Sequence, residues 1–267
     1  MADLLGGSAP APGAAASSAS GALLTSLRAP FCGRDLELGL LTRLATEAAE
    51  ERQVRFCLVT GSPGVGKTRL LRELAQALQT RVSAPYRVFS GSILPEGGPP
   101  LAALSEQLLQ RFLIDLRDGG PSARDKLLRG CRSLLPGVRA TEVAHLLGDM
   151  MRLPFPESAV TEPRPGQRPE PRLYLALKRV WSADAARGPI ALLFDNVEQA
   201  TPELVNLLHY LAAGLTSVPV LLCAFARPDV EEAHPSFGEG EVPCERLQLA
   251  PLIPKEAVAL LWSLTRD

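Results

Sequence analysis

One short segment constrains this chain more than any other. It reads Gly61-Ser62-Pro63-Gly64-Val65-Gly66-Lys67-Thr68 and fills every defined position of the pattern G-x-x-x-x-G-K-[ST]. An apolar run at 54–60 precedes it, and an apolar helical face follows it. This strand, loop and helix context predicts a phosphate-binding loop. The alternative is a glycine-rich turn that happens to precede Lys-Thr, and the flanking strand and helix count against it.

The chemistry of such a loop assigns roles to its residues. Glycines let the backbone curl so that successive N–H groups point at phosphate oxygens, and the helix N-terminus adds partial positive charge. We expect Lys67 to contact the β- and γ-phosphates and the Thr68 hydroxyl to ligate Mg²⁺. The residues expected to bind the nucleotide here are Gly61, Ser62, Pro63, Gly64, Val65, Gly66, Lys67, Thr68 and Arg69.

A second signature is the apolar run at 190–194, which ends in Asp195. Such a run is typical of a central parallel strand, buried on both faces, whose last side chain emerges at the carboxyl edge of the sheet. We expect Asp195 to hold Mg²⁺ directly or through a water. The alternative is a strand that simply ends in Asp at a turn. The upstream phosphate loop favours the metal-binding interpretation.

A third candidate is Arg227, which follows an apolar strand at 218–226 and precedes Pro228. An arginine at that edge can reach a γ-phosphate and so distinguish ATP from ADP. It can equally be a solvated arginine at a proline turn, because proline explains the end of the strand just as well. The local sequence leaves both interpretations open.

The order of the predicted elements indicates an α/β fold with a doubly wound, mainly parallel sheet of the P-loop NTPase type. A helical insertion, Pro-rich and broken by glycine, is predicted at 119–171 between strands two and three, and its part at 161–171 is predicted to be a loop. The other predicted elements are helices at 35–51, 67–79, 100–116 and 172–186 and strands at 54–60, 87–91, 190–195 and 218–226.

Composition narrows the class of protein. Residues 1–29 are rich in Ala, Ser, Gly and Pro and lack a basic start, so they predict a disordered tail or linker and no secretory signal. No apolar run is long enough to span a bilayer, and the five cysteines are widely spaced, so we expect a cytoplasmic protein.

The formal net charge of −1 makes nucleic acid an unlikely partner through this domain. The histidines show no ligand spacing, so no metal site of protein side chains alone is expected.

Several short blocks resemble the STAND-type AAA ATPases, which occur in bacterial regulators and beside bacterial Ser/Thr kinase domains. These blocks are FCGRDLE at 31–37, GSPGVGKT at 61–68, LLFDN at 192–196, AFARPD at 224–229 and LAPLIPKEAVALL at 249–261. The resemblance implies an ATPase core at 30–267, with a helical lid beginning at 251–267. It also implies that Gly33 and Arg34 lie near the adenine and that Arg227 senses phosphate. A protein partner or fused output domain, and a nucleotide-dependent oligomer, are implied as well.

The chain departs from this family at two points. The residue after the strand-ending acid is usually acidic, but here it is Asn196, which can position a water yet cannot accept its proton. Glu198 lies nearby, but two positions further on we expect its side chain to be redirected. The chain also stops at Asp267, where the family usually continues. The output domain is therefore expected on a partner, or the chain is a fragment of a longer protein.

Together these features predict an ATP-binding regulatory switch in signal transduction or transcriptional regulation, with slow, Mg²⁺-dependent ATP hydrolysis. The residues expected to act in catalysis are Lys67, Asp195, Asn196 and Arg227. One alternative is an origin-binding or other DNA-handling AAA ATPase, and another is a nucleotide-locked scaffold without hydrolysis. The sequence contains no motif that reads the base, so the choice of ATP over GTP is not fixed by it.

Overall fold

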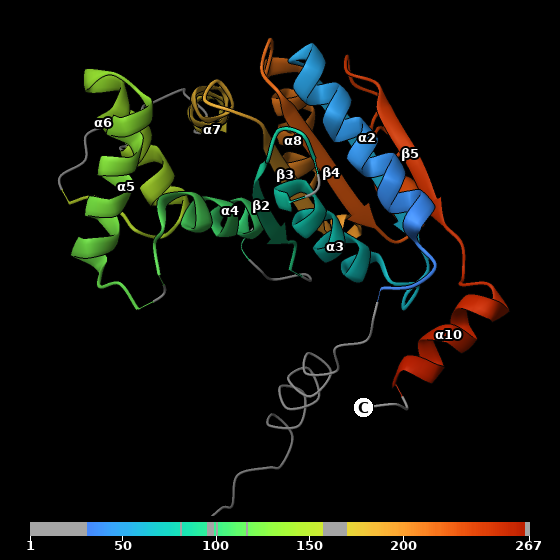
Figure 1. Cartoon of the computed structure of the whole chain (residues 1–267). Helices are drawn as coiled ribbons and strands as arrows, with labels where there is room; N and C mark the ends of the chain where they lie inside the picture. The colour runs from blue at the N-terminus through green and yellow to red at the C-terminus, as the bar shows by residue number, and fades with distance from the viewer. Residues whose placement is uncertain are drawn as a thin grey trace, which may run out of the picture. The chain divides into compact units, whose positions relative to one another are not determined.

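The computed structural model describes residues 31–80, 82–94, 99, 101–115, 117–156 and 170–264 (Figure 1). The predicted tail at 1–29 and most of the predicted loop at 161–171 lie outside the described residues. The chain divides into two compact units, one of residues 1–33 with 252–267 and one of residues 34–251. The elements are α2 (Asp35–Glu51), β1 (Val54–Gly61), α3 (Lys67–Thr80), β2 (Arg87–Ser92), α4 (Ala102–Phe112), α5 (Gly120–Leu134), α6 (Gly137–Met150), α7 (Glu170–Ala185), β3 (Ile190–Asp195), the 3-10 turn η1 (Val197–Gln199), α8 (Pro202–Gly214), β4 (Val220–Ala226), α9 (Val230–Ala233), β5 (Cys244–Leu249) and α10 (Pro254–Leu264).

The larger unit is built on a parallel sheet with the strand order β2-β3-β4-β1-β5. Every residue of β3 and β4 is buried, as apolar strands in the middle of a parallel sheet must be. Helices α2 and α3 lie on the near side of the sheet in Figure 1, and α8 lies behind it. Helices α4 to α7 connect β2 to β3. This arrangement confirms the predicted doubly wound α/β fold with a helical insertion between strands two and three.

Side chains at alternate positions along the strands contribute to hydrophobic layers on the two faces of the sheet. Phe56 of β1 and Phe194 of β3 pack in one cluster with Trp181 of α7 and Leu208 of α8. Residues of opposite parity point to the other face, because side chains alternate along a strand. Apolar residues of α2 and α3 cover that face, and Leu41 is completely buried there. Each such side chain stabilises the fold by about 1.5–3 kcal/mol.

Helix α4 closes the exposed edge of β2. A Cβ atom on Gly91 would collide with the backbone carbonyl of Ala103, so the helix approaches the strand more closely than another residue would permit. The Gln110 amide accepts a hydrogen bond from the Ser90 N–H at 3.0 Å and donates one to the Ser90 carbonyl at 2.8 Å. Glu106 accepts from the Ser92 N–H at 2.9 Å. These contacts satisfy backbone groups that an open edge would offer to another chain.

Some boundaries and elements differ from the prediction. Helix α4 spans Ala102–Phe112, shorter than the predicted 100–116, and α7 starts at Glu170, inside the predicted loop. Strand β5 was not predicted, because its side chains are mostly exposed and include Glu245 and Arg246, so it has no continuous apolar run. Among the described residues, no helix combines the length and hydropathy needed to cross a membrane.

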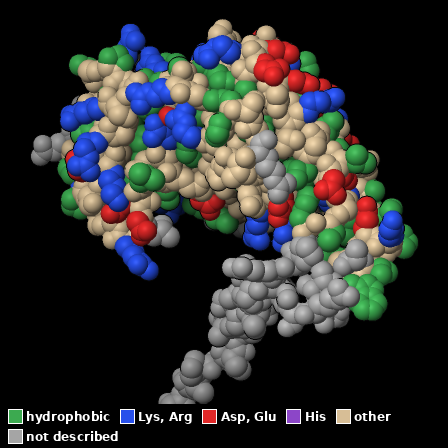
Figure 2. Space-filling model, viewed as in Figure 1, with side chains coloured by type: hydrophobic (Ala, Val, Ile, Leu, Met, Phe, Trp, Pro, Cys, Tyr) green, Lys and Arg blue, Asp and Glu red, His purple; other side chains and the backbone are tan. Residues whose placement is uncertain are grey.

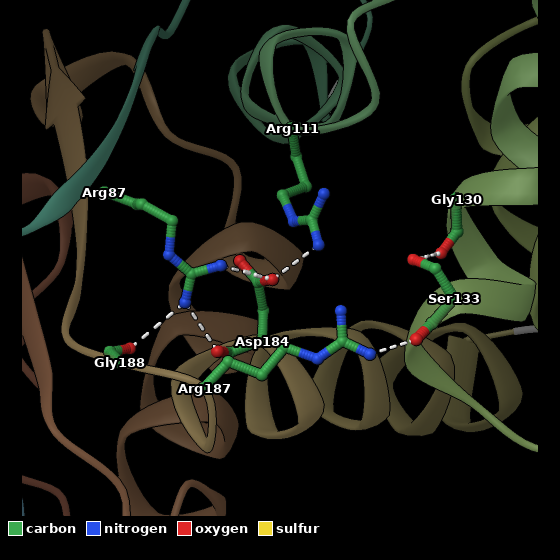
Figure 3. A network of polar contacts seen from close by, with 7 residues as sticks. All are labelled: Arg87, Arg111, Gly130, Ser133, Asp184, Arg187 and Gly188. Carbon is green, nitrogen blue, oxygen red and sulfur yellow. Dashed lines mark hydrogen bonds and ion pairs between the residues drawn. The ribbon is translucent and has the colours of Figure 1, made fainter.

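A buried carboxylate ties the insertion to the sheet (Figure 3). Asp184 of α7 is completely buried, and its Oδ1 atom lies 2.7 Å from Arg87 Nη1 of β2 and 2.6 Å from Arg111 Nη2 of α4. Arg87 Nη2 also donates to the carbonyls of Asp184 and Gly188, at 2.6 and 3.1 Å. Asp184 therefore neutralises two cations from two different elements.

We predict that Asp184→Ala lowers the free energy of unfolding by about 3 kcal/mol, since it leaves Arg111, which is 17% exposed, and the more exposed Arg87 without their counter-charge. Asp125→Ala is the matched control, because Asp125 forms a mostly exposed i,i+4 pair with Arg129 and should contribute at most about 1 kcal/mol. Urea unfolding of both variants checks this. Equal losses would show that the buried cluster does not hold the insertion.

Candidate functional site

The predicted phosphate loop connects β1 to α3, with Lys67 as the first residue of the helix. Gly64 and Gly66 have φ angles of 79° and 103°, in the region that favours glycine. Apart from the adjacent residues of the chain, no described atom lies within 4 Å of where a Cβ would stand on Gly64 or Gly66, so the space beside the backbone is open. The Val65 N–H donates to the Ser62 carbonyl at 3.2 Å, which holds the turn. The loop thus has the shape that anion binding by backbone N–H groups requires.

The Lys67 side chain is folded back onto this loop. Its Nζ atom donates to the carbonyls of Gly61 and Ser62 at 2.6 and 3.2 Å. Burial lowers the pKa of the Lys67 ammonium, and the carboxylates of Glu198 and Asp195 oppose that shift. The Lys67 ammonium is therefore held beside the loop by two carbonyl groups, whose place the oxygens of a bound phosphate can take.

Thr68 and Asp195 meet although they belong to α3 and β3. The Thr68 hydroxyl donates to Asp195 Oδ2 at 2.8 Å, and the Asn196 N–H donates to Asp195 Oδ1 at 3.0 Å. Mg²⁺ takes oxygen ligands and in nucleotide sites uses one or two protein oxygens with phosphate and water. A hydroxyl and a carboxylate oxygen in contact beside the phosphate loop fit that requirement. These two residues would hold Mg²⁺, which would neutralise charge on the phosphate oxygens.

Asn196 adopts a left-handed backbone conformation, with φ 59° and ψ 43°, which Asn tolerates better than most residues. Its side-chain Nδ2 atom donates to the Ser92 hydroxyl of β2 at 3.0 Å. The amide also lines the cavity described next. The carboxamide thus links β3 to β2 at the carboxyl edge of the sheet.

A cavity of about 420 Å³ opens beside the loop and gathers most of the predicted residues. It is lined by Pro63, Gly64, Gly66, Lys67, Thr68, Arg69, Asn196, Glu198 and Arg227. Arg227, at the end of β4, thus shares one cavity with Lys67. Arg69 contributes from the first turn of α3, where it pairs with Glu73 at 2.7 Å.

Glu198 is the residue that sequence reasoning undervalued. The turn η1 brings its side chain back toward the loop, where it lines the cavity and is only 6% exposed. Its Oε1 atom lies 2.9 Å from Arg227 Nε, and its Oε2 atom accepts the Arg227 backbone N–H at 3.0 Å. Val197, in the same turn, is completely buried.

Arg34, predicted near the adenine, is buried to 6% exposure. Its guanidinium donates to Glu37 at 2.8 Å, to the Val65 carbonyl of the phosphate loop at 3.2 Å and to the Ala250 carbonyl. It therefore ties the start of α2 to the loop and to the residue after β5. Gly33 belongs to the smaller unit; its φ is 69°, and an added Cβ would collide with the Glu256 side chain.

The sequence matches the family model of the AAA ATPase domain over residues 30–223, which is more than half of the chain. The chain belongs to the AAA ATPase family. Membership implies nucleotide binding, and the matched range contains the phosphate loop and the strand that ends in Asp195. The matched range also contains β2 and the start of β4, and it ends before Arg227 and β5.

A search of curated proteins found no match to this AAA ATPase domain. Among solved structures, the Orc1 protein of Aeropyrum pernix, determined in complex with DNA, is similar with a TM-score of 0.47 and 19% sequence identity. The match covers 90% of this chain and 51% of that one, so this chain spans about half the length of the Orc1 chain.

We predict that Arg34→Ala lowers the free energy of unfolding by about 2–4 kcal/mol, because charge-assisted hydrogen bonds to three partners are lost in a buried position. Arg43→Ala on the same helix is the control, since that side chain is 65% exposed and should contribute less than about 1 kcal/mol. Chemical unfolding of the two variants provides the comparison. A neutral Arg34→Ala would mean that the guanidinium is free for another role.

Proposed function

We propose that this AAA ATPase domain is an ATP-binding regulatory switch of the STAND type, with slow, Mg²⁺-dependent ATP hydrolysis. The observation that carries the proposal is that one cavity is lined both by Lys67 from the phosphate loop and by Arg227 at the end of β4. Such a cavity offers two cations to the β- and γ-phosphates of a triphosphate. A regulatory role in signal transduction or transcription, in the cytoplasm, follows from the family resemblance of the sequence.

Different residues bind the phosphates and the magnesium ion. Backbone N–H groups of the loop and the Lys67 ammonium take the β- and γ-phosphates, and Thr68 with Asp195 takes the magnesium ion. Arg227 is the residue whose contacts depend on whether the γ-phosphate is present. Because Asp195 ends β3 and Arg227 follows the neighbouring strand β4, a change at the γ-phosphate would act on both strands. A bound state that differs between ATP and ADP is what a switch needs.

The expected slow turnover rests on the described residues that follow Asp195. The neutral Asn196 amide donates to Ser92 and cannot take a proton from water. The nearest carboxylate, Glu198, is engaged by Arg227. A long-lived ATP state gives time for a protein partner, a fused output domain or a nucleotide-dependent oligomer to respond.

Two alternatives make different predictions. A DNA-handling ATPase should bind duplex DNA in an ATP-dependent manner, whereas this chain has a formal net charge of −1 and side chains of both signs occur across the face in Figure 2. A nucleotide-locked scaffold should bind ATP and never turn it over. DNA-binding and multiple-turnover assays with ATP, GTP and ADP distinguish the three functions.

Lys67→Ala should weaken ATP binding by about a hundredfold or more without unfolding the domain, because it removes a charge at the loop mouth rather than a core side chain. Arg72→Ala is the control, since it removes an exposed cation from the same helix. Calorimetric titration with Mg²⁺ and ATP measures both affinities. Unchanged affinity in a folded Lys67→Ala variant would refute the site.

Asn196→Asp should raise ATP turnover by tenfold or more, since a carboxylate at this position can accept a proton from the attacking water. Aspartate also tolerates the left-handed backbone. Asn196→Gly keeps that backbone and removes the amide without adding a base, so its turnover should not rise. Steady-state phosphate release measures the rates, and equal rates in the parent and Asn196→Asp would show that the base lies elsewhere.

A further inference from the structure

Glu198 is an acidic residue at the cavity that Lys67 and Arg227 also line. It shares the 420 Å³ cavity with Lys67, and it forms the ion pair with Arg227 at 2.9 Å. Its second oxygen binds the Arg227 backbone N–H at 3.0 Å, so both carboxylate oxygens are committed to the same residue. A carboxylate that is only 6% exposed is poorly screened by water. It therefore acts strongly on Arg227 and on a charge that approaches Arg227.

A γ-phosphate and Glu198 are both anions that pair with the same guanidinium. Arg227 is 37% exposed at its side chain, so it is open to the cavity as well as bound to Glu198. Its other acidic neighbour, Asp229, lies 3.7 Å from Nε and is 54% exposed, so it is the weaker competitor. ADP lacks the γ-phosphate, so it has no group that would compete with Glu198 for Arg227.

We propose that Glu198 is a specificity-determining latch, which holds Arg227 in the ATP-free chain and must release it before the γ-phosphate can be bound. The proposal rests on the proposed function, because it assumes that ATP occupies this cavity. Glu198 then lowers ATP affinity and leaves ADP affinity nearly unchanged. Its role is to set the ratio of ATP to ADP at which the domain changes state, and it does so without taking part in the reaction.

The test compares ATP and ADP affinities, in the presence of Mg²⁺, for the parent chain, Glu198→Gln and Arg227→Ala. Glu198→Gln removes the competing charge and keeps the side-chain size, so ATP should bind about tenfold more tightly and ADP should change by less than about twofold. Arg227→Ala should weaken ATP binding about tenfold to a hundredfold and hardly affect ADP.

Asp229→Asn is the matched control, because it removes one negative charge near the same arginine from an exposed position. It should change the ratio of ATP to ADP affinity by less than about threefold. Thermal unfolding of each variant verifies the fold, and Glu198→Ala replaces Glu198→Gln if the latter does not fold. The same direction of change is expected from both substitutions.

Two results would overturn the latch. One is an unchanged or lower ratio of ATP to ADP affinity in Glu198→Gln. The other is an ATP affinity equal to that of the parent with turnover abolished, which would make Glu198 the catalytic base. If the parent chain binds neither nucleotide, the proposed function and the latch are both wrong. If it binds both and only the ratio fails to respond, the latch alone is wrong.

Discussion

The hydrogen bond between Thr68 and Asp195 joins residues 127 positions apart, and the site depends on the sheet that makes this contact possible. Strand β1 ends in the phosphate loop, β3 ends in Asp195, and β4 lies between them and ends before Arg227. Because all three strands are parallel, their carboxyl ends meet at one edge. The strand order therefore brings Lys67, Thr68 and Arg227 to one cavity, and Asp195 is hydrogen-bonded to Thr68 beside it.

The strongest parts of the site could be predicted because their signals are local. The phosphate loop is a continuous motif between a strand and a helix, and Asp195 ends a continuous apolar run. Glu198 was undervalued because its direction depends on the turn η1 and on a contact with Arg227, which belongs to another strand. The burial of Arg34 depends on the carbonyls of Val65 and Ala250, which have no signature in a sequence.

The elements of the fold likewise divide into those with a local sequence signal and those without one. Strands β1, β3 and β4 were predicted because central parallel strands are apolar on both faces. Strand β5 pairs with β1 through its backbone and leaves its side chains mostly exposed, so its composition carries little signal. The protection of β2 by α4 depends on the Gln110 and Glu106 side chains, and these read as an ordinary polar helix face until the strand is placed beside them.

We have proposed that this domain reports on ATP rather than hydrolysing it quickly, and the groups at the carboxyl edge of the sheet support that proposal. Among the described residues at this edge, Asn196 is neutral and Glu198 is paired with Arg227, while Lys67 and Arg227 both line the cavity. The most direct measurement is calorimetric titration of the unaltered chain with ATP, with Mg²⁺ and with Mg²⁺ removed by chelation. The account predicts binding at one site that is tighter with Mg²⁺. Absence of ATP binding in the presence of Mg²⁺ would contradict it.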